Sequence, residues 1–302
     1  MGLTERIKDI ELELSRTQHN KATTTHIGML KSQLARLRTQ LMEGNSKSGG
    51  PQEGFDVQKA GDGRVCLIGF PSVGKSSLLG AVTDTKSEVA SYEFTTLTCI
   101  PGNVTINDIK IQMLDLPGII EGAASGKGRG REVIAVARSA DLILMVLDAA
   151  KESNNQHRNI LTRELETMGI RLNKKIPDIY FRKKTGGGIK FNATVTLTEL
   201  GDDPADTVGR ILHSYRIHHA EFLVRENITI DDVIDCIEGN RKYVRCLYCY
   251  NKIDSLSLEE VDTIARMPDS LVMSVHLKLN LDYLLQRMWD YMGLQRVYTK
   301  RR

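Results

Sequence analysis

Cysteine is scarce in this chain, which contains 5 cysteines among 302 residues. Their odd number and wide spacing exclude a disulfide-rich scaffold and indicate a reducing compartment. Cys246 and Cys249 are spaced like half of a zinc site, but no second pair of cysteines or histidines lies at a suitable spacing. Because both cysteines fall within an apolar strand pattern, we expect them to pack in the core.

Long hydrophobic runs and a strong net charge are also absent. No apolar stretch approaches the roughly 18 residues that a membrane span requires. The N-terminus is amphipathic and contains acidic residues, unlike a signal or transit peptide. A net charge of +3 is too small to indicate nucleic-acid binding by itself. The sequence therefore predicts a cytoplasmic protein that does not bind a membrane.

Residues 1–50 are predicted to form a helical hairpin followed by a linker. Apolar residues recur every three or four positions from Leu3 to Leu14 and from Ile27 to Leu41, with a polar stretch between them. So thin a hairpin must pack on the main domain or on a partner. Its basic residues outnumber its acidic ones, and two interpretations stay open: an arm that faces RNA or the ribosome, or an ordinary solvated face.

The sequence Gly69–Ser77 matches the phosphate-binding pattern G-x-x-x-x-G-K-[ST] between a strand pattern and a helix pattern. A strand–loop–helix of this kind directs backbone N–H groups and the positive end of the helix dipole toward an anion. We expect Lys75 to reach the β- and γ-phosphates and Ser76 to bind Mg²⁺. The predicted phosphate-binding residues are Gly69, Ser72, Val73, Gly74, Lys75, Ser76, Ser77 and, further along, Gly118.

The motif N-K-x-D at Asn251–Asp254 follows an apolar strand pattern and is typical of guanine recognition. The Asp254 carboxylate can accept hydrogen bonds from guanine N1–H and the 2-amino group. Adenine has no donors there, so the carboxylate would lose water without gaining a partner. We expect Asn251 to join the strand to the phosphate loop, and Lys252 to cover the base. Backbone N–H groups for guanine O6 are expected from Ser274, Val275 and His276.

Two further motifs complete the predicted site. Asp115-Leu116-Pro117-Gly118 follows a strand pattern, and Asp115 is expected to orient Mg²⁺ while the Gly118 N–H meets the γ-phosphate. This second switch comprises Asp115, Pro117, Gly118 and Ile119, and the first switch comprises Phe94, Thr95 and Thr96. We expect Thr96 to complete the metal shell together with Ser76 and Asp115. Four motifs in this order predict a protein that binds GTP/GDP and hydrolyses GTP.

Strand and helix patterns alternate from Arg64 onward, which predicts a doubly wound α/β sheet of the P-loop GTPase type. We expect the nucleotide domain in two parts, 63–168 and 242–293, and a tail at 294–302. Cys99 to Ile106 and Ile109 to Leu114 are predicted to form an antiparallel hairpin.

The α/β alternation is interrupted between residues 169 and 241, where we expect an inserted small α+β domain. Two strand patterns flank Gly186–Gly188, which predicts a second hairpin. Residues 171–190 contain seven Lys or Arg and one Asp. That charge suits either a solvated face or contact with a phosphate backbone. Three histidines nearby are expected at the surface or in packing: His213, His218 and His219.

The motif sequences resemble a known family. Gly69–Ser77, Tyr92–Gly102 and Asp115–Ala124 are similar to the Obg-related GTPases and, more narrowly, to the developmentally regulated GTP-binding (DRG) proteins. Gly126–Arg131 and Lys278–Leu285 resemble the second eukaryotic branch of that family. The resemblance covers nearly the whole chain, and it implies a ribosomal-protein-S5-like insertion and a C-terminal TGS domain. The sequence stops about where a TGS domain would begin, and two interpretations stay open: the sequence is a truncated form, or the protein lacks that domain.

The resemblance also implies mechanism and partners. Ile119 occupies the place of the glutamine that orients water in Ras-like GTPases, so intrinsic hydrolysis is expected to be slow. In related GTPases K⁺ can supply charge, but the phosphate-loop asparagine that commonly binds it is Ser72 here. Stimulation by K⁺ and completion of the site by a partner therefore both stay open. The family implies translating ribosomes and a dedicated DRG-family regulatory protein as partners.

Two competing functions follow from the same residues. A scaffold that binds GTP and barely hydrolyses it would also explain Ile119, and a turnover assay separates the two. An Obg-like ATPase would share the fold, but the intact N-K-x-D motif at Asn251–Asp254 argues against it.

Overall fold

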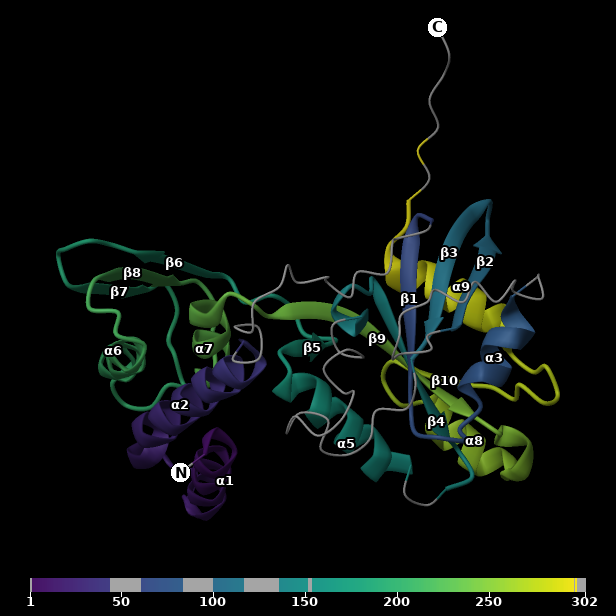
Figure 1. Ribbon diagram of the computed structural model, residues 1–302, viewed down its shortest axis with the longest axis horizontal. Coiled ribbons are helices and arrows are strands. Elements are labelled where there is room, and N and C mark those ends of the chain that lie inside the picture. The colour runs from purple at the N-terminus through teal and green to yellow at the C-terminus, as the bar shows by residue number, and fades with distance from the viewer. Residues whose placement is uncertain are drawn as a thin grey trace, which may run out of the picture. The chain divides into compact units, whose positions relative to one another are not determined.

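The computed structural model describes residues 2–43, 61–83, 100–116, 136–151, 154–295 and 297. The chain divides into two compact units (Figure 1). One combines Met1–Gln52 with Lys175–Arg241, and the other combines Glu53–Lys174 with Lys242–Arg302. The chain therefore leaves the second unit after residue 174 and returns to it at residue 242. None of the helices in the described part has the length and hydropathy of a membrane span.

The second unit is built on a sheet of seven described strands. They are β1 (Gly63–Ile68), β2 (Ile100–Ile106), β3 (Ile109–Asp115), β4 (Leu142–Asp148), β5 (Ile170–Leu172), β9 (Lys242–Asn251) and β10 (Ser270–Val272). Their order is β10-β9-β4-β1-β3-β2, and β5 pairs with the start of β9. β2 is antiparallel to β3, and the other pairs are parallel. This is the predicted doubly wound sheet.

Helices cover both faces of this sheet, which explains why β4 is buried along its whole length. The described helices are α3 (Lys75–Val82), α5 (Asn154–Thr167), α8 (Leu258–Ala265), α9 (Leu281–Met292) and the 3-10 helix η3 (Ile253–Ser255). Leu78 of α3 and Leu284 of α9 share one apolar cluster with Leu144 of β4. On the opposite face, the guanidinium of Arg158 in α5 lies 3.7 Å from the ring centroid of Tyr248 in β9.

Two sequence expectations about this unit had different outcomes. The antiparallel β2–β3 hairpin is confirmed, with Ile106 paired to Ile109 and positive φ at Asn107 and Asp108. The expected start of the insertion at residue 169 differs from the structure. Ile170–Leu172 pairs in parallel with β9 and so belongs to the large sheet.

The other unit joins the N-terminal helices to the inserted segment. Its elements are α1 (Leu3–Arg16), η1 (Lys21–Thr23), α2 (Thr24–Glu43), β6 (Ile179–Lys183), β7 (Ile189–Ala193), α6 (Pro204–Ser214), β8 (Ala220–Val224) and α7 (Ile230–Glu238). The three strands form a small sheet in the order β6-β8-β7. Phe222 of β8 is fully buried between Phe181 and Phe191, whose ring centroids lie 5.8 and 6.2 Å from its own.

The predicted hairpin around Gly186–Gly188 is wrong. β6 and β7 do not pair with each other, because β8 lies between them, antiparallel to β6 and parallel to β7. The connection instead crosses one end of β8: Lys184 N–H donates to His219 O, and Ala220 N–H donates to Gly188 O. A glycine-rich turn predicts a reversal of the chain, but it does not specify which strands become neighbours.

The helical hairpin packs on the insertion within its own unit, a partner that the sequence did not identify. Ile27 and Leu30 of α2 are buried. A Cβ on Gly28 would lie 3.2 Å from Ile211 Cδ1 in α6, so the two helices approach closely here. Ion pairing and hydrogen bonding add specificity, as in the 2.7 Å contact between Lys31 Nζ and Asp231 Oδ2.

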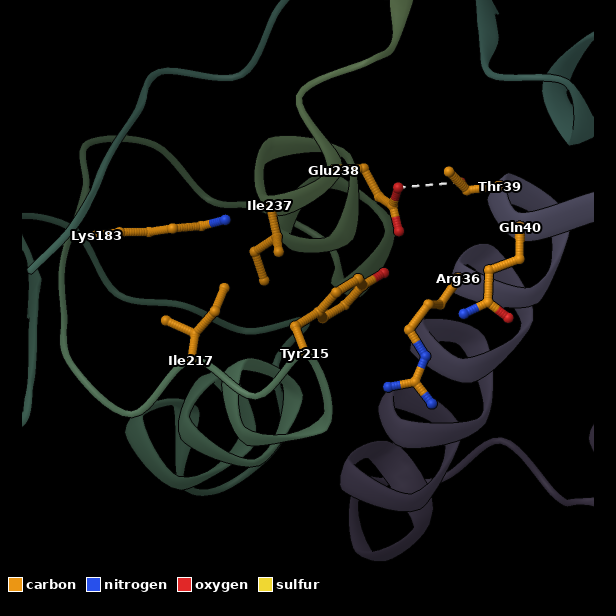
Figure 2. Close-up of a pocket in the computed structure, with 8 residues that line it drawn as sticks. All are labelled: Arg36, Thr39, Gln40, Lys183, Tyr215, Ile217, Ile237 and Glu238. Atoms are coloured by element: carbon orange, nitrogen blue, oxygen red, sulfur yellow. Dashed lines mark hydrogen bonds between the residues drawn. The ribbon is translucent and has the colours of Figure 1, made fainter. Parts of the chain in front are cut away.

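A pocket of about 280 Å³ opens at this junction, between α2, β6 and α7 (Figure 2). Thr39 Oγ1 donates to Glu238 Oε2 at 3.0 Å, and the Tyr215 ring lies between Glu238 and Arg36. Burial, followed by the nearby Glu238 carboxylate, raises the pKa of Tyr215 far above its ordinary value. The phenol therefore stays neutral and acts as a structural hydrogen-bonding group, with Ser32 O 3.3 Å from its hydroxyl oxygen.

Candidate nucleotide-binding site

The parallel strands bring the predicted motifs to one edge of the large sheet. Ligands of such sheets bind outside the carboxyl ends of the strands. The phosphate loop follows β1, Asp115 ends β3, Asp148 ends β4 and Asn251 ends β9. Asp148 and Asn251 are register partners, so the carboxyl ends of β4 and β9 lie side by side.

The phosphate loop needs glycine at two positions. Gly74 has φ +99° as the residue before α3, and a Cβ there would lie 2.4 Å from Asn251 Nδ2. A Cβ on Gly69 would lie 2.4 Å from the carbonyl oxygen of Val146 in β4. Ser72 also has a positive φ, of 63°, and its side chain is exposed. The loop is thus pressed against β4 and β9, which fixes its backbone for an anion.

Lys75 begins α3 and bends back over the loop. Its Nζ donates to Gly69 O at 3.0 Å and to Phe70 O at 2.9 Å. Burial lowers the pKa of Lys75, and the nearby Asp115 carboxylate acts in the opposite direction. The Lys75 ammonium is therefore held at the loop by two backbone carbonyl oxygens. A phosphate, which carries a full negative charge, would attract it more strongly than these carbonyl groups do.

Ser76 and Asp115 form the described part of the predicted metal site. Ser76 Oγ donates to Asp115 Oδ2 at 2.5 Å. Asp115 Oδ1 is buried and has no hydrogen-bond partner among the described residues. A buried carboxylate oxygen without a partner is unfavourable, and a hydroxyl with a carboxylate is the oxygen donor set that Mg²⁺ prefers. The two residues therefore fit the predicted Mg²⁺.

Several predicted site residues lie outside the described residues. These are Phe94, Thr95 and Thr96 of the first switch and Pro117, Gly118 and Ile119 of the second. Their predicted roles stay predictions. Ser77, on the exposed side of the first turn of α3, is described and lies next to Ser76.

Asn251 joins the phosphate loop to the loop after β10. Its Nδ2 donates to Val73 O at 2.9 Å, and its Oδ1 accepts from the Val275 N–H at 3.1 Å. The side chain is buried, with 4% of its surface exposed. The contact with Val73 is the connection to the phosphate loop that we expected for Asn251, whereas the contact with Val275 was not expected. One amide thus fixes the distance between the two loops.

Asp254 is oriented by a serine from the next loop. Ser274 Oγ donates to Asp254 Oδ1 at 2.5 Å, and Ser274 is completely buried. This hydrogen bond is the main reason that the pKa of Asp254 lies below its ordinary value. The ionised carboxylate, held in one orientation, keeps its remaining lone pairs for donors such as those of guanine.

The expected backbone donors for guanine O6 are only partly free. The Ser274 N–H donates to Leu279 O, and the Val275 N–H donates to Asn251 Oδ1. His276 makes no such backbone hydrogen bond within the described chain, and its side chain is exposed. In this structure, His276 is therefore the member of the three whose N–H is available.

Lys252 makes an ion pair that the sequence did not reveal. Its Nζ lies 2.7 Å from Asp148 Oδ2, with φ +67° at Lys252 itself. Asp148 is buried, with 4% of its side chain exposed, whereas Lys252 is 42% exposed. The second carboxylate oxygen, Oδ1, accepts from the Ala150 N–H at 3.2 Å. Asp148 therefore holds the lysine of the N-K-x-D motif at the sheet edge.

Two family models match the chain. The model described as "50S ribosome-binding GTPase" matches residues 64–183, and that described as "C-terminal region of MMR_HSR1 domain" matches residues 186–294. "Developmentally-regulated G-protein 2" of Arabidopsis thaliana is 62% identical over 99% of this chain and 74% of its own length. "Developmentally-regulated GTP-binding protein 2" of Homo sapiens is 58% identical over 100% of this chain and 82% of its own length. The chain belongs to the developmentally regulated GTP-binding protein family.

The solved structures that are similar to this DRG-family chain are more distant from it. Era of Aquifex aeolicus, bound to GDP and AlF4⁻, is 18% identical with a TM-score of 0.42, over 78% of this chain and 58% of Era. The G domain of the FeoB iron transporter of T. maritima is 17% identical with a TM-score of 0.41, over 76% of this chain and 97% of that domain.

Family membership makes this chain a GTP-binding protein with a GTPase domain. Sequence reasoning missed Asp148 in this domain. A signal was present, because Asp148 ends the apolar run Leu142–Leu147 at the same edge as the N-K-x-D motif. A single acidic residue at the end of a buried strand stands at no fixed sequence distance from the N-K-x-D motif. The sequence pattern therefore did not indicate that Asp148 pairs with Lys252.

Proposed function

We propose that this DRG-family chain binds GTP together with Mg²⁺ and hydrolyses it to GDP and phosphate as a molecular switch. The observation that carries the proposal is the position of Asn251. Its two hydrogen bonds hold the phosphate loop and the Ser274–Val275 loop at a fixed separation. One rigid frame thus presents phosphate-binding and guanine-binding groups to the two ends of a single nucleotide.

The chain's own groups would act as follows. The first N–H groups of α3 and the Lys75 ammonium bind the β- and γ-phosphates, and Lys75 exchanges its loop carbonyls for phosphate oxygens. Asp254 accepts from guanine N1–H and the 2-amino group, and the Lys252 stem covers the base. Ser76 and Asp115 hold the metal, which when bound supplies positive charge to the β- and γ-oxygens.

Slow intrinsic hydrolysis is part of the proposal. Ile119 cannot polarise water, so orientation of the nucleophile must come from another group. K⁺ is one source of the missing charge, and a partner protein or the ribosome is another. If neither contributes, the chain is a GTP-binding scaffold with negligible turnover.

GTP turnover by this chain in K⁺ and in Na⁺, at equal ionic strength, tests the proposal. Faster hydrolysis in K⁺ would mean that a cation supplies the charge that Ile119 lacks. Equal and negligible rates with normal GTP binding would support the scaffold instead. Failure to bind GTP at all would refute the assignment of the site. Repeating the assay without Mg²⁺ tests the roles of Ser76 and Asp115, because hydrolysis should then stop.

We further propose a cytoplasmic role linked to translation, with ribosomes and a DRG-family regulatory protein as partners. Support comes from the family model described as a 50S ribosome-binding GTPase and from the basic residues of the smaller unit. Co-sedimentation of the protein with ribosomes, with GDP or a non-hydrolysable GTP analogue, tests this link. Equal absence from the ribosome fraction in both states would refute it.

A further inference from the structure

The small sheet has one covered face and one open face. Side chains alternate along a strand, so Phe181, Phe222 and Phe191 lie on one side, where α6 and α7 pack. Their sequence neighbours lie on the other side. The strand register places those neighbours in two rows: Arg182–Glu221–Lys190 and Tyr180–Leu223–Asn192.

Positive charge dominates the first row. Glu221 binds Lys184 Nζ at 2.6 Å, and Lys184 is the main cause of its lowered pKa, followed by Lys190 and Arg182. Neither Arg182 nor Lys190 has an ion-pair partner within the described residues. Both side chains are exposed, so two cations flank a carboxylate that Lys184 already neutralises.

The second row provides an aromatic ring and an amide beside these cations. Tyr180 is 43% exposed, which is high for a large side chain in a strand. Leu223 beside it is half-buried and forms an apolar floor, and Asn192 on the far strand is exposed. A flat ring, an apolar floor and an amide can stack on a base and hydrogen bond to its edge.

The connection between β6 and β7 leaves one end of this face unobstructed. A Cβ on Gly186, Gly187 or Gly188 would have no neighbour within 4 Å. No side chain projects from these three residues, so an extended strand of nucleic acid could leave the face over them.

We propose that the open face of the β6-β8-β7 sheet binds single-stranded RNA. Arg182 and Lys190 contact phosphates, and Tyr180, in the neighbouring row beside Arg182, stacks on a base. The proposal rests on the proposed link to translation, for which it names the contacting surface. An acidic peptide would use the two cations but would gain little from an exposed ring and a neighbouring amide, so the observations favour RNA.

The test measures binding of a 5′-fluorescein-labelled ten-residue oligouridine to the full chain by fluorescence anisotropy at several salt concentrations. The double variant Arg182→Ala/Lys190→Ala should bind more weakly, and the slope of log K against log salt should fall by about 1.4, at about 0.7 for each phosphate contact. Tyr180→Ala should weaken binding at least about 5-fold. Tyr180→Phe should bind like the unchanged protein, because the ring is retained.

Matched controls separate the face from general charge and exposure. Arg210 in α6 is 55% exposed and pairs with Asp206 on the helical side of the same unit, so Arg210→Ala should leave the affinity and the salt slope unchanged. Tyr283 in the other unit is 50% exposed, and Tyr283→Ala should likewise have no effect. Equal thermal midpoints and GTP affinities establish that the variants are folded.

Three results would overturn the proposal. One is RNA affinity that is equal in the variants of the face and in the controls. Another is equal binding of duplex RNA, since a duplex offers no base for stacking. The third is binding of fluorescein-labelled polyglutamate by a chain that does not bind the oligouridine, which would assign the face to an acidic protein segment. GTP hydrolysis measured on the same variants is independent of these outcomes, so failure here and failure of the proposed GTPase activity are distinguishable.

Discussion

The ion pair between Asp148 and Lys252 gives the sharpest test of how this site holds a nucleotide. Asp148→Asn keeps the shape of the side chain and removes its charge. The Lys252 ammonium, 2.7 Å from the carboxylate, then loses its fixed partner while the guanine-reading Asp254 is untouched. We expect faster release of guanine nucleotide with little change in the preference for guanine over other bases.

The expected magnitude follows from the burial of the two partners. Exposed ion pairs contribute about 0.2–1 kcal/mol, and hydrogen bonds to charged groups contribute about 1.5–3 kcal/mol. Asp148 is buried but Lys252 is 42% exposed, so solvent screens part of the interaction. An intermediate loss of about 1–2 kcal/mol is equivalent to about 5- to 30-fold faster release of GDP. The physical cause is the side-chain entropy of Lys252, which must then be lost on nucleotide binding.

Stopped-flow release of a fluorescent GDP analogue measures this effect. The exposed pair Asp262–Arg266 in α8 provides the control, because Asp262→Asn removes a pair whose side chains are 60% and 77% exposed. Combining Asp148→Asn with Lys252→Met should add little to either single change, since both remove the same interaction. Unchanged release from Asp148→Asn, or fully additive effects in the double variant, would refute a role for this pair in nucleotide binding.

Three other predictions concern the same site. Asp254→Asn should lose GTP affinity and gain affinity for xanthosine triphosphate in competition binding, because the new amide can donate to a carbonyl at position 2; retained GTP affinity would contradict the assignment of Asp254. Lys75→Ala should abolish tight triphosphate binding. In the unchanged protein without nucleotide, burial lowers the pKa of Lys75, and a bound phosphate would keep the amine protonated. GTP binding should therefore take up protons, and the affinity should weaken as pH rises through the lowered pKa. Calorimetry in buffers of different ionisation enthalpy measures that uptake, and none in the alkaline range would argue against it. Ser274→Ala removes the main cause of the lowered pKa of Asp254, so GTP affinity on acidification should begin to fall at a higher pH than in the unchanged protein; coincident pH profiles would exclude this role for Ser274.

Where a motif has a fixed spacing, the sequence predicted the structure well. The phosphate loop lies between β1 and α3, and Asn251 is joined to that loop, as expected, through a hydrogen bond to the carbonyl of Val73. The Asn107–Asp108 turn was equally predictable, since residues that tolerate positive φ separate two strand patterns. In these cases the residues that determine the local structure, such as those that tolerate positive φ, lie within the segment itself and can be read from its sequence.

Contacts between distant parts of the chain were not predictable in this way. Nothing near Gly186–Gly188 indicates that β8, about 30 residues later, separates the two flanking strands. The apolar stripe at Ile27 and Leu30 showed that α2 needs a partner, but an amphipathic pattern does not name it. The Val275 N–H was expected to be free for guanine, and only the structure shows that it donates to Asn251.

The pairing of the N-terminal hairpin with the insertion also sets an order of events during synthesis. Helix α2 begins at Thr24, and its partner α6 begins at Pro204, roughly 180 residues later. At about 5–20 residues per second, α2 leaves the ribosome about 10–40 s before α6 exists. For that interval Ile27 and Leu30 lack the part of their apolar cover that α6 and α7 provide in the folded unit. Strand β9 is made later still, so the central pairing of β4 with β9 and the N-K-x-D motif that β9 carries form only after the insertion has been synthesised.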